Sequence, residues 1–382
     1  MEINRVLAEE IVRRFAEKRA KVVVIYGARQ VGKTTLVKHT LRQKYSDKKV
    51  LFVEGDTYKY NAILSSRDLE KLSALVKGYD ILCVDEAQKI ENIGINLKIL
   101  HDRFKDALKI IVTGSSALEL ADKIKEPLTG RHYTYHLYPI STLELAATYD
   151  HYQLQADFEA RMLFGSYPEI FSIDSREDKI AYLNSLSADY LYKDVLELEN
   201  IKFNKKLRDL LQLLAFQIGS EVSYNELATR LGMDRKTVDT YIDLLEKAFV
   251  ITRLYGFSRN LRKELNKKPK IYFYDLGIRN DLIGNFNYLN MRNDTGALWE
   301  NFLLLERRKR NAYKKHYSQI YFWRTYTGAE LDYIEEYDGY LHGYEFKYNK
   351  TARAHKSWLE TYQQKQADFT CISQDNALDF II

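Results

Sequence analysis

Residues 22–45 read VVVIYGARQVGKTTLVKHTLRQKY, and this stretch decides the fold of the N-terminal region. It joins an apolar run, a glycine-containing turn and a segment with the apolar spacing of a helix. The turn fits G-x-x-x-x-G-K-[ST], in which glycines let the backbone curl so that its N–H groups point at phosphate oxygens. The start of the following helix adds a favourable potential for anions. The sequence therefore predicts a strand, a phosphate-binding loop and a helix, in that order.

The turn supplies the residues that we expect to bind a nucleotide. Lys33 is expected to reach the β- and γ-phosphates, and Thr34 to offer a hydroxyl to Mg²⁺. ATP and Mg²⁺ are therefore the expected cofactors. The full expected nucleotide-binding set is Gly27, Ala28, Arg29, Gln30, Val31, Gly32, Lys33, Thr34 and Thr35.

Three further apolar runs, at 50–56, 80–86 and 109–115, alternate with segments of helical spacing. Short buried strands that alternate with helices are typical of a parallel α/β sheet. We therefore expect an α/β domain over residues 1–145.

Two acids, Asp85 and Glu86, end the second of these runs. Ligands of α/β sheets bind at the carboxyl ends of the strands, so both acids are expected near the phosphate loop. We expect Asp85 to join the Mg²⁺ shell, and Glu86 to orient or deprotonate the attacking water.

Hydroxyl side chains end the run at 109–115. Ser115 is the candidate that polarises the water or senses the γ-phosphate. Thr113 and Ser116 compete for the same role.

The middle of the chain is mostly helical, and residues 146–215 are expected to form a helical lid or linker. Residues 220–255 then read SEVSYNELATRLGMDRKTVDTYIDLLEKAFVITRLY, which predicts a helix-turn-helix followed by the first strand of a wing. Ser223 with Glu226 fits a capping box for the first helix. Residues 216–290 are therefore expected to form a winged helix-turn-helix.

The second helix of this motif is expected to meet DNA near its start, as recognition helices do. Winged helices also serve as protein–protein modules, so both readings stay open. The residues expected to contact DNA are Arg235, Lys236, Thr237 and Tyr241.

The net charge of +5 is concentrated in two stretches of the C-terminal half. Residues 256–274 hold six basic side chains against one acid, and residues 306–316 hold the same ratio. Such stretches favour an anionic partner, and DNA is the expected one. The alternative is that they are ordinary solvated faces.

Residues 330–347 read ELDYIEEYDGYLHGYEFK and predict a hairpin that turns at Asp338-Gly339. In that register position 332 faces 345 and position 330 faces 347. Glu330, Asp332, Glu345 and Lys347 would then share one face, and Leu331, Tyr333, Tyr344 and Phe346 the other.

Two carboxylates directly opposite each other destabilise a sheet unless something compensates their charge. A divalent metal is the expected compensation, either Mg²⁺ or Mn²⁺. The alternative is a solvated hairpin in which Glu330 pairs with Lys347 across the strands.

Motifs in both halves of the chain resemble a widespread group of prokaryotic AAA+-type ATPases fused to a C-terminal region of unknown function. The motifs are GARQVGKTTL, VDEAQ, VTGSSALEL and LTGRHYTYHLYPIS, then FGSYPEIF, YLYKDVLEL, PKIYFYDLGIRN and GALWENFLLLE. The resemblance implies a homo-oligomer, because such sites commonly lie between subunits. It also implies that Arg131 is a γ-phosphate or finger arginine, against the alternative of a surface arginine in a turn.

The spacing D…E-x-K resembles the restriction-endonuclease-like core of the PD-(D/E)xK nucleases. That resemblance implies a metal site of Glu300, Asp332 and Glu345 with Lys347 as a catalytic group, in a domain over residues 291–382. Such folds are often kept as inactive nucleic-acid grips, so the fold does not establish cleavage.

Three functions remain open: an ATP-driven DNA-processing enzyme with a nuclease site, an ATP-gated DNA-binding or signalling switch, and a protein-remodelling ATPase. ATP hydrolysis is common to all three. No stretch approaches the length of an apolar membrane span, and the two cysteines form neither a disulfide framework nor a zinc site. The expected location is the cytoplasm.

Overall fold

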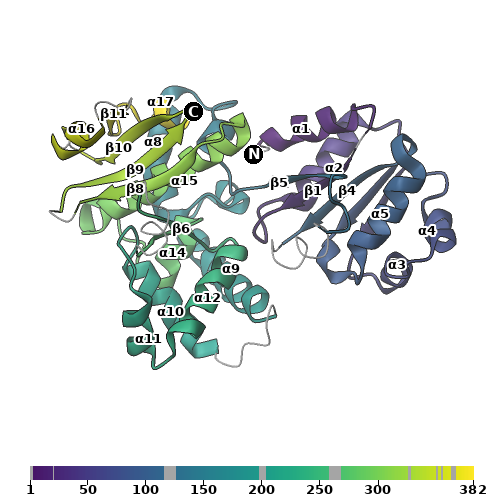
Figure 1. Ribbon diagram of the computed structural model, residues 1–382, viewed down its shortest axis with the longest axis horizontal. Coiled ribbons are helices and arrows are strands. Elements are labelled where there is room, and N and C mark those ends of the chain that lie inside the picture. Colours follow the sequence, from purple (N-terminus) through teal and green to yellow (C-terminus); the bar gives the residue numbers. More distant parts are fainter. Residues whose placement is uncertain are drawn as a thin grey trace. The chain divides into compact units, whose positions relative to one another are not determined.

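The chain divides into two compact units, each of which is described by itself. One holds Glu2–Pro139 with Lys247–Phe249, and the other holds Ile140–Glu246 with Val250–Ile382. The computed structural model describes residues 3–19, 21–115, 126–197, 204–257, 268–325, 328–349, 352–353, 356–362 and 367–382 (Figure 1).

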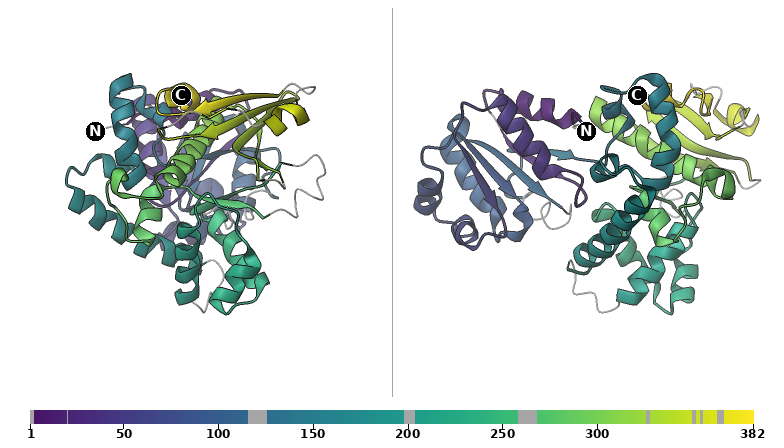
Figure 2. Two further views of the ribbon diagram at one scale, coloured as in Figure 1. Left: turned by 90° about the vertical axis from the view of Figure 1, so that its left-hand side faces the viewer. Right: turned by 180° about the vertical axis from the view of Figure 1, so that it is seen from behind.

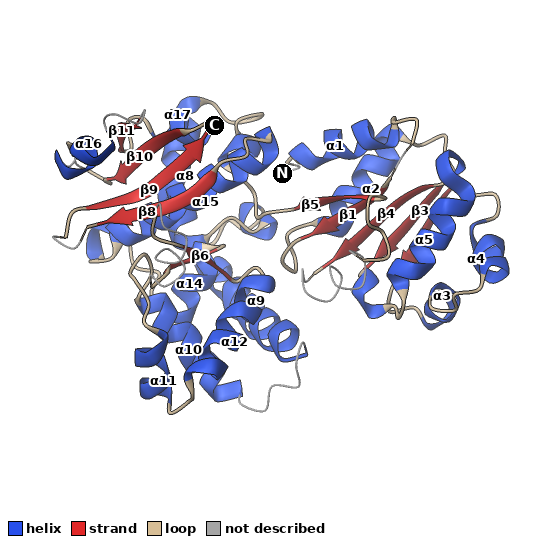
Figure 3. Cartoon of the chain, in the orientation of Figure 1, coloured by secondary structure: helices blue, strands red, loops and turns tan. Residues whose placement is uncertain are grey.

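The first unit is built on a five-stranded parallel sheet in the order β2-β3-β4-β1-β5 (Figure 3). The four predicted strands are present, and β5 is an addition that the sequence did not reveal. The strands are β1 (Val22–Tyr26), β2 (Val50–Glu54), β3 (Ile81–Asp85), β4 (Lys109–Gly114) and β5 (His132–His136).

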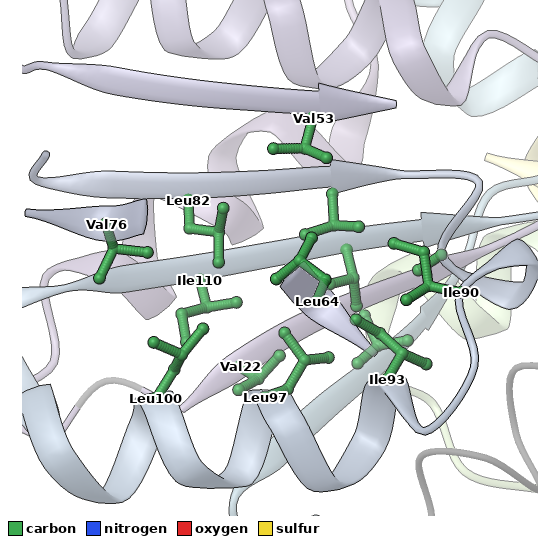
Figure 4. Close-up of a cluster of buried hydrophobic side chains, with 14 of the residues drawn as sticks. Val22, Val53, Leu64, Val76, Leu82, Ile90, Ile93, Leu97, Leu100 and Ile110 are labelled. Atoms are coloured by element: carbon green, nitrogen blue, oxygen red, sulfur yellow. The ribbon is translucent and has the colours of Figure 1, made fainter. Parts of the chain in front are cut away.

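Helices cover both faces of this sheet (Figures 1 and 2). The helix α5 lays Ile93, Leu97 and Leu100 against Leu82 and Ile110, and all five side chains are buried (Figure 4). This packing fixes the strands, and hence the loops at their carboxyl ends. The helices are α1 (Val6–Phe15), α2 (Lys33–Lys44), α3 (Tyr58–Leu64), α4 (Leu69–Val76) and α5 (Ile93–Phe104).

The second unit begins with helices, as expected from the middle of the chain. They include the long helix α9, followed by α10 and by the helix pair α11 and α12. The helices are α7 (Thr142–Leu145), α8 (His151–Phe164), α9 (Arg176–Glu197), α10 (Asn204–Phe216), α11 (Tyr224–Leu231), α12 (Arg235–Lys247) and α14 (Leu276–Leu282).

The pair α11 and α12 is followed by a two-stranded antiparallel hairpin of β6 (Ile251–Leu254) and β7 (Lys270–Phe273). Gly232 ends α11 in the left-handed region with φ 55°. The capping box expected at Ser223 does not form, because its side chain makes no cap hydrogen bond and Glu226 pairs with Arg230 instead. Residues 258–267, which hold four of the six basic residues of the stretch 256–274, lie outside the described residues.

A four-stranded mixed sheet in the order β11-β10-β9-β8 completes this unit (Figure 3). The helix α15 precedes the sheet in sequence, and α16 lies between β10 and β11. The elements are α15 (Thr295–Lys314), β8 (Gln319–Arg324), β9 (Glu330–Tyr337), β10 (Tyr340–Phe346), α16 (Lys356–Tyr362), β11 (Ala367–Ile372) and α17 (Ala377–Ile381).

The predicted hairpin register is confirmed from the turn to Tyr333, since Tyr337 pairs with Tyr340 and Tyr333 with Tyr344. Asp338 and Gly339 both have positive φ, as this kind of two-residue turn requires.

The expected division of side chains between the two faces of this hairpin is wrong at one position. Leu331 packs with Ile334 and Leu341, whereas Tyr333 stacks on Phe346. The reason is a register shift between β8 and β9, which breaks the regular alternation at this point.

Candidate functional site

The phosphate loop joins the end of β1 to the start of α2. Its backbone enters the left-handed region at Gln30 (φ 58°) and at Gly32 (φ 91°), immediately before the helix begins at Lys33. Gly27 has no room for a side chain, because a Cβ there would lie 2.3 Å from the carbonyl oxygen of Leu137. Both glycines of the motif are therefore required by the backbone.

Lys33 lies buried inside this loop. Its Nζ donates hydrogen bonds to the carbonyl oxygens of Gly27 at 2.9 Å and Ala28 at 2.8 Å. The loop thereby holds the ammonium group next to the space that a phosphate would take.

Asp85 brings two hydroxyl groups together at the end of β3. Thr34 Oγ1 donates to Asp85 Oδ2 at 2.7 Å, and Thr113 Oγ1 donates to Asp85 Oδ1. A hydroxyl beside a carboxylate is the oxygen-donor set that suits Mg²⁺. The residues expected to hold Mg²⁺ are therefore adjacent, and they fit the ion.

Glu86 follows β3 in a left-handed conformation, with φ 51° and ψ 45°. Its Oε2 accepts a hydrogen bond from Gln88 Nε2 at 2.5 Å, and the same nitrogen lies 2.9 Å from Ser115 Oγ. Ser115 is therefore brought to the site together with Glu86. Gln88 is a residue that sequence reasoning missed, although it stands two positions from the expected catalytic acid.

A cavity of about 390 Å³ opens between the loop and Glu86. The side chains of Ala28 and Val31 are buried away from it, so these two belong to the loop by their backbone alone. The residues that line the cavity are Arg29, Gln30, Gly32, Lys33, Thr34, Thr35, Glu86 and Lys89.

Arg131 is not brought to this site within its own chain. It stands just before β5, where its carbonyl oxygen accepts from the N–H of Val22 at the start of β1. The phosphate loop lies at the opposite end of β1. The guanidinium of Arg131 pairs instead with Asp102, at 2.8 Å.

The residues expected to meet DNA on α12 divide into two pairs. Arg235 and Lys236 are exposed. Thr237 instead donates its hydroxyl to Asp234 at 2.7 Å and helps to cap the helix, and Tyr241 is buried in the core. Tyr241 was expected to contact DNA, and its burial contradicts this, because its position falls on the apolar stripe of α12.

A cavity of about 320 Å³ lies beside Arg235, between the start of α11, α12 and the hairpin. Three cationic side chains line it, namely Arg235, Arg253 and Lys268, together with the anionic Asp239. Arg253 is engaged by Asp243 and Glu246, each at 2.6 Å.

The basic stretch at 306–316 is partly internal, although Lys314 and Lys315 are exposed. Arg307 pairs with Glu335 at 2.7 Å, and Lys309 pairs with Glu306 at 2.6 Å, all four being buried. Since Arg307 and Lys309 neutralise internal acids, these two cations do not support an anionic partner.

The acids of the C-terminal hairpin converge with Glu300 of α15, as expected, but around a lysine. Lys270 Nζ lies 3.1 Å from Glu300 Oε1, 2.5 Å from Glu330 Oε1 and 4.0 Å from Asp332 Oδ1. Tyr272 also donates to Glu300 Oε1, at 2.5 Å. Lys270 is a further member of this site that sequence reasoning missed, because β7 lies far from the hairpin in sequence.

Asp332 and Glu345 make further contacts of their own. Glu345 Oε1 pairs with Lys347 at 2.7 Å, and Asp332 Oδ2 accepts from the N–H of Phe346 at 2.8 Å. Burial, with the charges of Glu300 and Glu345, raises the pKa of Asp332 above its usual range. Over the described ranges, no group of three or more His, Cys, Asp or Glu side chains is arranged to hold a metal ion.

The fold and the phosphate loop define the first unit as a P-loop nucleotide-binding domain. Residues 19–146 match the sequence profile of the AAA domain. Residues 155–289 match a domain of unknown function, DUF8612, and residues 295–377 match another, DUF4143.

Of the helices that the structure describes, none is long and apolar enough to span a membrane.

The chain is also similar to proteins from bacteria and archaea. An uncharacterised protein of Mycobacterium tuberculosis is 29% identical over 346 residues, which are 90% of this chain and 74% of that protein. One from Methanocaldococcus jannaschii is 25% identical over 308 residues, with 76% and 67% covered. The crystal structure of Cdc6p from Pyrobaculum aerophilum aligns at 12% identity and a TM-score of 0.29, over 73% of this chain and 93% of that one.

Proposed function

We propose that this chain binds Mg-ATP at the phosphate loop and hydrolyses it, and that the bound nucleotide controls the binding of DNA by the region of α11 and α12. One observation carries the first part. Lys33, Thr34 and Glu86 line one cavity, with Asp85 bonded to Thr34. A phosphate-binding loop, an Mg²⁺ donor pair and a candidate base are thus assembled in one place.

The binding step uses the loop. Lys33 exchanges its bonds to two loop carbonyls for the phosphate oxygens, and the N–H groups at the start of α2 face the same anion. Thr34 and Asp85 would hold Mg²⁺, which neutralises phosphate charge when it is bound.

The hydrolytic step uses Glu86. Its carboxylate accepts a proton from the water that attacks the γ-phosphorus, and the bond to the β–γ bridging oxygen breaks. Gln88 fixes the orientation of this carboxylate through one hydrogen bond and contacts Ser115 through the other. Arg131 takes part only if a neighbouring copy of the chain supplies it.

Replacing Lys33 by Ala is expected to weaken nucleotide binding about 10- to 100-fold, because a hydrogen bond to a charged group is worth about 1.5–3 kcal/mol. Calorimetric titration with ATP and Mg²⁺ measures the loss. Lys44→Ala, at the exposed end of the same helix, is the matched control and is expected to bind as the wild type does. Unchanged affinity in Lys33→Ala would remove the loop from nucleotide binding.

The DNA-binding part of the proposal is supported by Arg235 and Lys236. Both are exposed at the start of α12, and Arg235 also lines the cavity that Lys268 faces. Cations placed this way meet the phosphates of a duplex. This function requires no metal at the C-terminal carboxylates.

Arg235→Ala and Lys236→Ala are each expected to weaken DNA binding uniformly across sequences, and to reduce the slope of log affinity against log salt by about one. Fluorescence anisotropy with labelled duplex DNA over a salt series measures both effects. Lys71→Ala removes the same charge from α4 and is expected to leave the slope unchanged. If neither Arg235→Ala nor Lys236→Ala changed the slope of log affinity against log salt, α12 would bind a protein partner in place of DNA.

A further inference from the structure

Lys270 occupies the centre of the C-terminal carboxylate cluster. Its side chain is almost completely buried, with 3% of the residue exposed. Its Nζ lies within 4.0 Å of carboxylate oxygens of Glu300, Glu330 and Asp332. An ammonium group therefore stands where these acids converge.

One oxygen of each carboxylate in this cluster already pairs with a donor of the chain. Glu300 Oε1 accepts from both Lys270 and Tyr272. Asp332 Oδ2 accepts from a backbone N–H, and Glu345 Oε1 pairs with Lys347. Within this cluster, Glu345 Oε2 is the one carboxylate oxygen of the described residues that is buried without a hydrogen-bond partner. A divalent ion needs several free oxygens at about 2.0–2.6 Å, and this donor set does not fit one as it stands.

The cluster nevertheless requires a cation. Glu300, Glu330, Asp332 and Glu345 lie together with the two ammonium groups of Lys270 and Lys347. These carboxylates are only partly exposed, and such a group without a compensating charge would destabilise the sheet. Lys270 supplies the charge that the sequence alone assigned to a metal.

We propose that Lys270 is an internal counter-cation that takes the place of a divalent metal. In the wild-type chain the cluster binds neither Mg²⁺ nor Mn²⁺, and the C-terminal unit holds its carboxylates without a metal. Removal of the ammonium group frees the oxygens of Glu300 and Asp332 and leaves an excess of negative charge. The vacated cluster then takes a divalent cation. This inference concerns the C-terminal unit alone and stands whether or not the chain hydrolyses ATP.

The test is a titration of the full nucleotide-free chain with Mn²⁺. Calorimetry measures the binding, and the melting temperature measures its effect on stability. Lys270→Met keeps the length of the side chain and removes its charge, and Lys270→Arg keeps the charge. Lys268→Met, two positions earlier at an exposed site, is the matched control. Asp332→Asn in the Lys270→Met background separates binding at this cluster from binding at the phosphate loop.

Lys270→Met is expected to gain one Mn²⁺ site, to melt at a higher temperature when Mn²⁺ is added, and to lose both effects with Asp332→Asn. The wild type, Lys268→Met and Lys270→Arg are expected to show no Mn²⁺ binding that depends on Asp332. Asp332-dependent binding of Mn²⁺ by the wild type would overturn the proposal. A Lys270→Met chain that gains no site, or that stays unfolded in excess Mn²⁺, would overturn it as well.

Discussion

Glu86→Gln is expected to lower steady-state ATP turnover by about 10²- to 10⁴-fold, because general-base catalysis contributes about that much and the amide cannot accept the proton. ATP affinity is expected to stay close to the wild-type value, since Lys33 and the loop are unchanged. Gln88 and Ser115 keep the geometry around position 86, so the variant isolates the loss of the base.

Phosphate release measures the turnover of this variant, and calorimetric titration measures its ATP affinity. Glu91→Gln, at an exposed position five residues further on, is the matched control and is expected to turn over ATP normally. Wild-type turnover in Glu86→Gln would show that another group activates the water.

Glu306→Ala is expected to lower the free energy of unfolding of the C-terminal unit by about 3–5 kcal/mol, the usual cost of removing one partner of a buried ion pair. Glu306 Oε1 lies 2.8 Å from Arg161 and 2.6 Å from Lys309, and all three side chains are buried. Its Oε2 accepts from both the N–H and the hydroxyl of Thr142. The variant leaves two buried cations without their acid.

Urea unfolding of Glu306→Ala and of the exposed control Glu159→Ala, on the neighbouring helix α8, measures the difference. The control is expected to change stability by no more than about 0.5 kcal/mol. A similar small change in Glu306→Ala would show that the buried cluster is not needed for stability.

The contribution of Glu306 also depends on pH. Burial by itself would raise its pKa, but Arg161 and Lys309 outweigh that effect and hold the pKa at about 2. Because the folded pKa lies below the unfolded one, the stabilisation is complete above about pH 4.5 and is lost as the pH falls toward 2. The difference between the wild type and Glu306→Ala is therefore expected to shrink over that window.

The sequence predicted those elements whose structure is determined by residues close together in the chain. The apolar run at 22–26, the glycine turn and the helix after it are all present, because each is determined by neighbouring residues. The Asp338-Gly339 turn fixed the hairpin register for the same reason. The strand β5 was missed because HYTYH is only half buried and forms no apolar run.

Contacts between segments that lie far apart in the sequence could not be predicted from neighbouring residues. Lys270 meets Glu300 only because the fold brings β7 against α15, and no spacing in the sequence indicates this contact. The buried partners of Arg307 and Lys309 likewise come from tertiary packing, so two cations of a run expected to face an anionic partner are internal. Position 241 was misjudged because its place on the apolar stripe of α12 outweighs its nearness to the helix start.

The claim that the nucleotide controls DNA binding is tested most directly with Glu86→Gln, which keeps ATP bound without consuming it. The measurement is the affinity of this variant for labelled duplex DNA by fluorescence anisotropy, with saturating Mg-ATP and separately with Mg-ADP. The two affinities are expected to differ by about 5- to 150-fold, the usual range of coupling between two sites. Equal affinities in the two nucleotide states would contradict the proposed control of DNA binding by ATP.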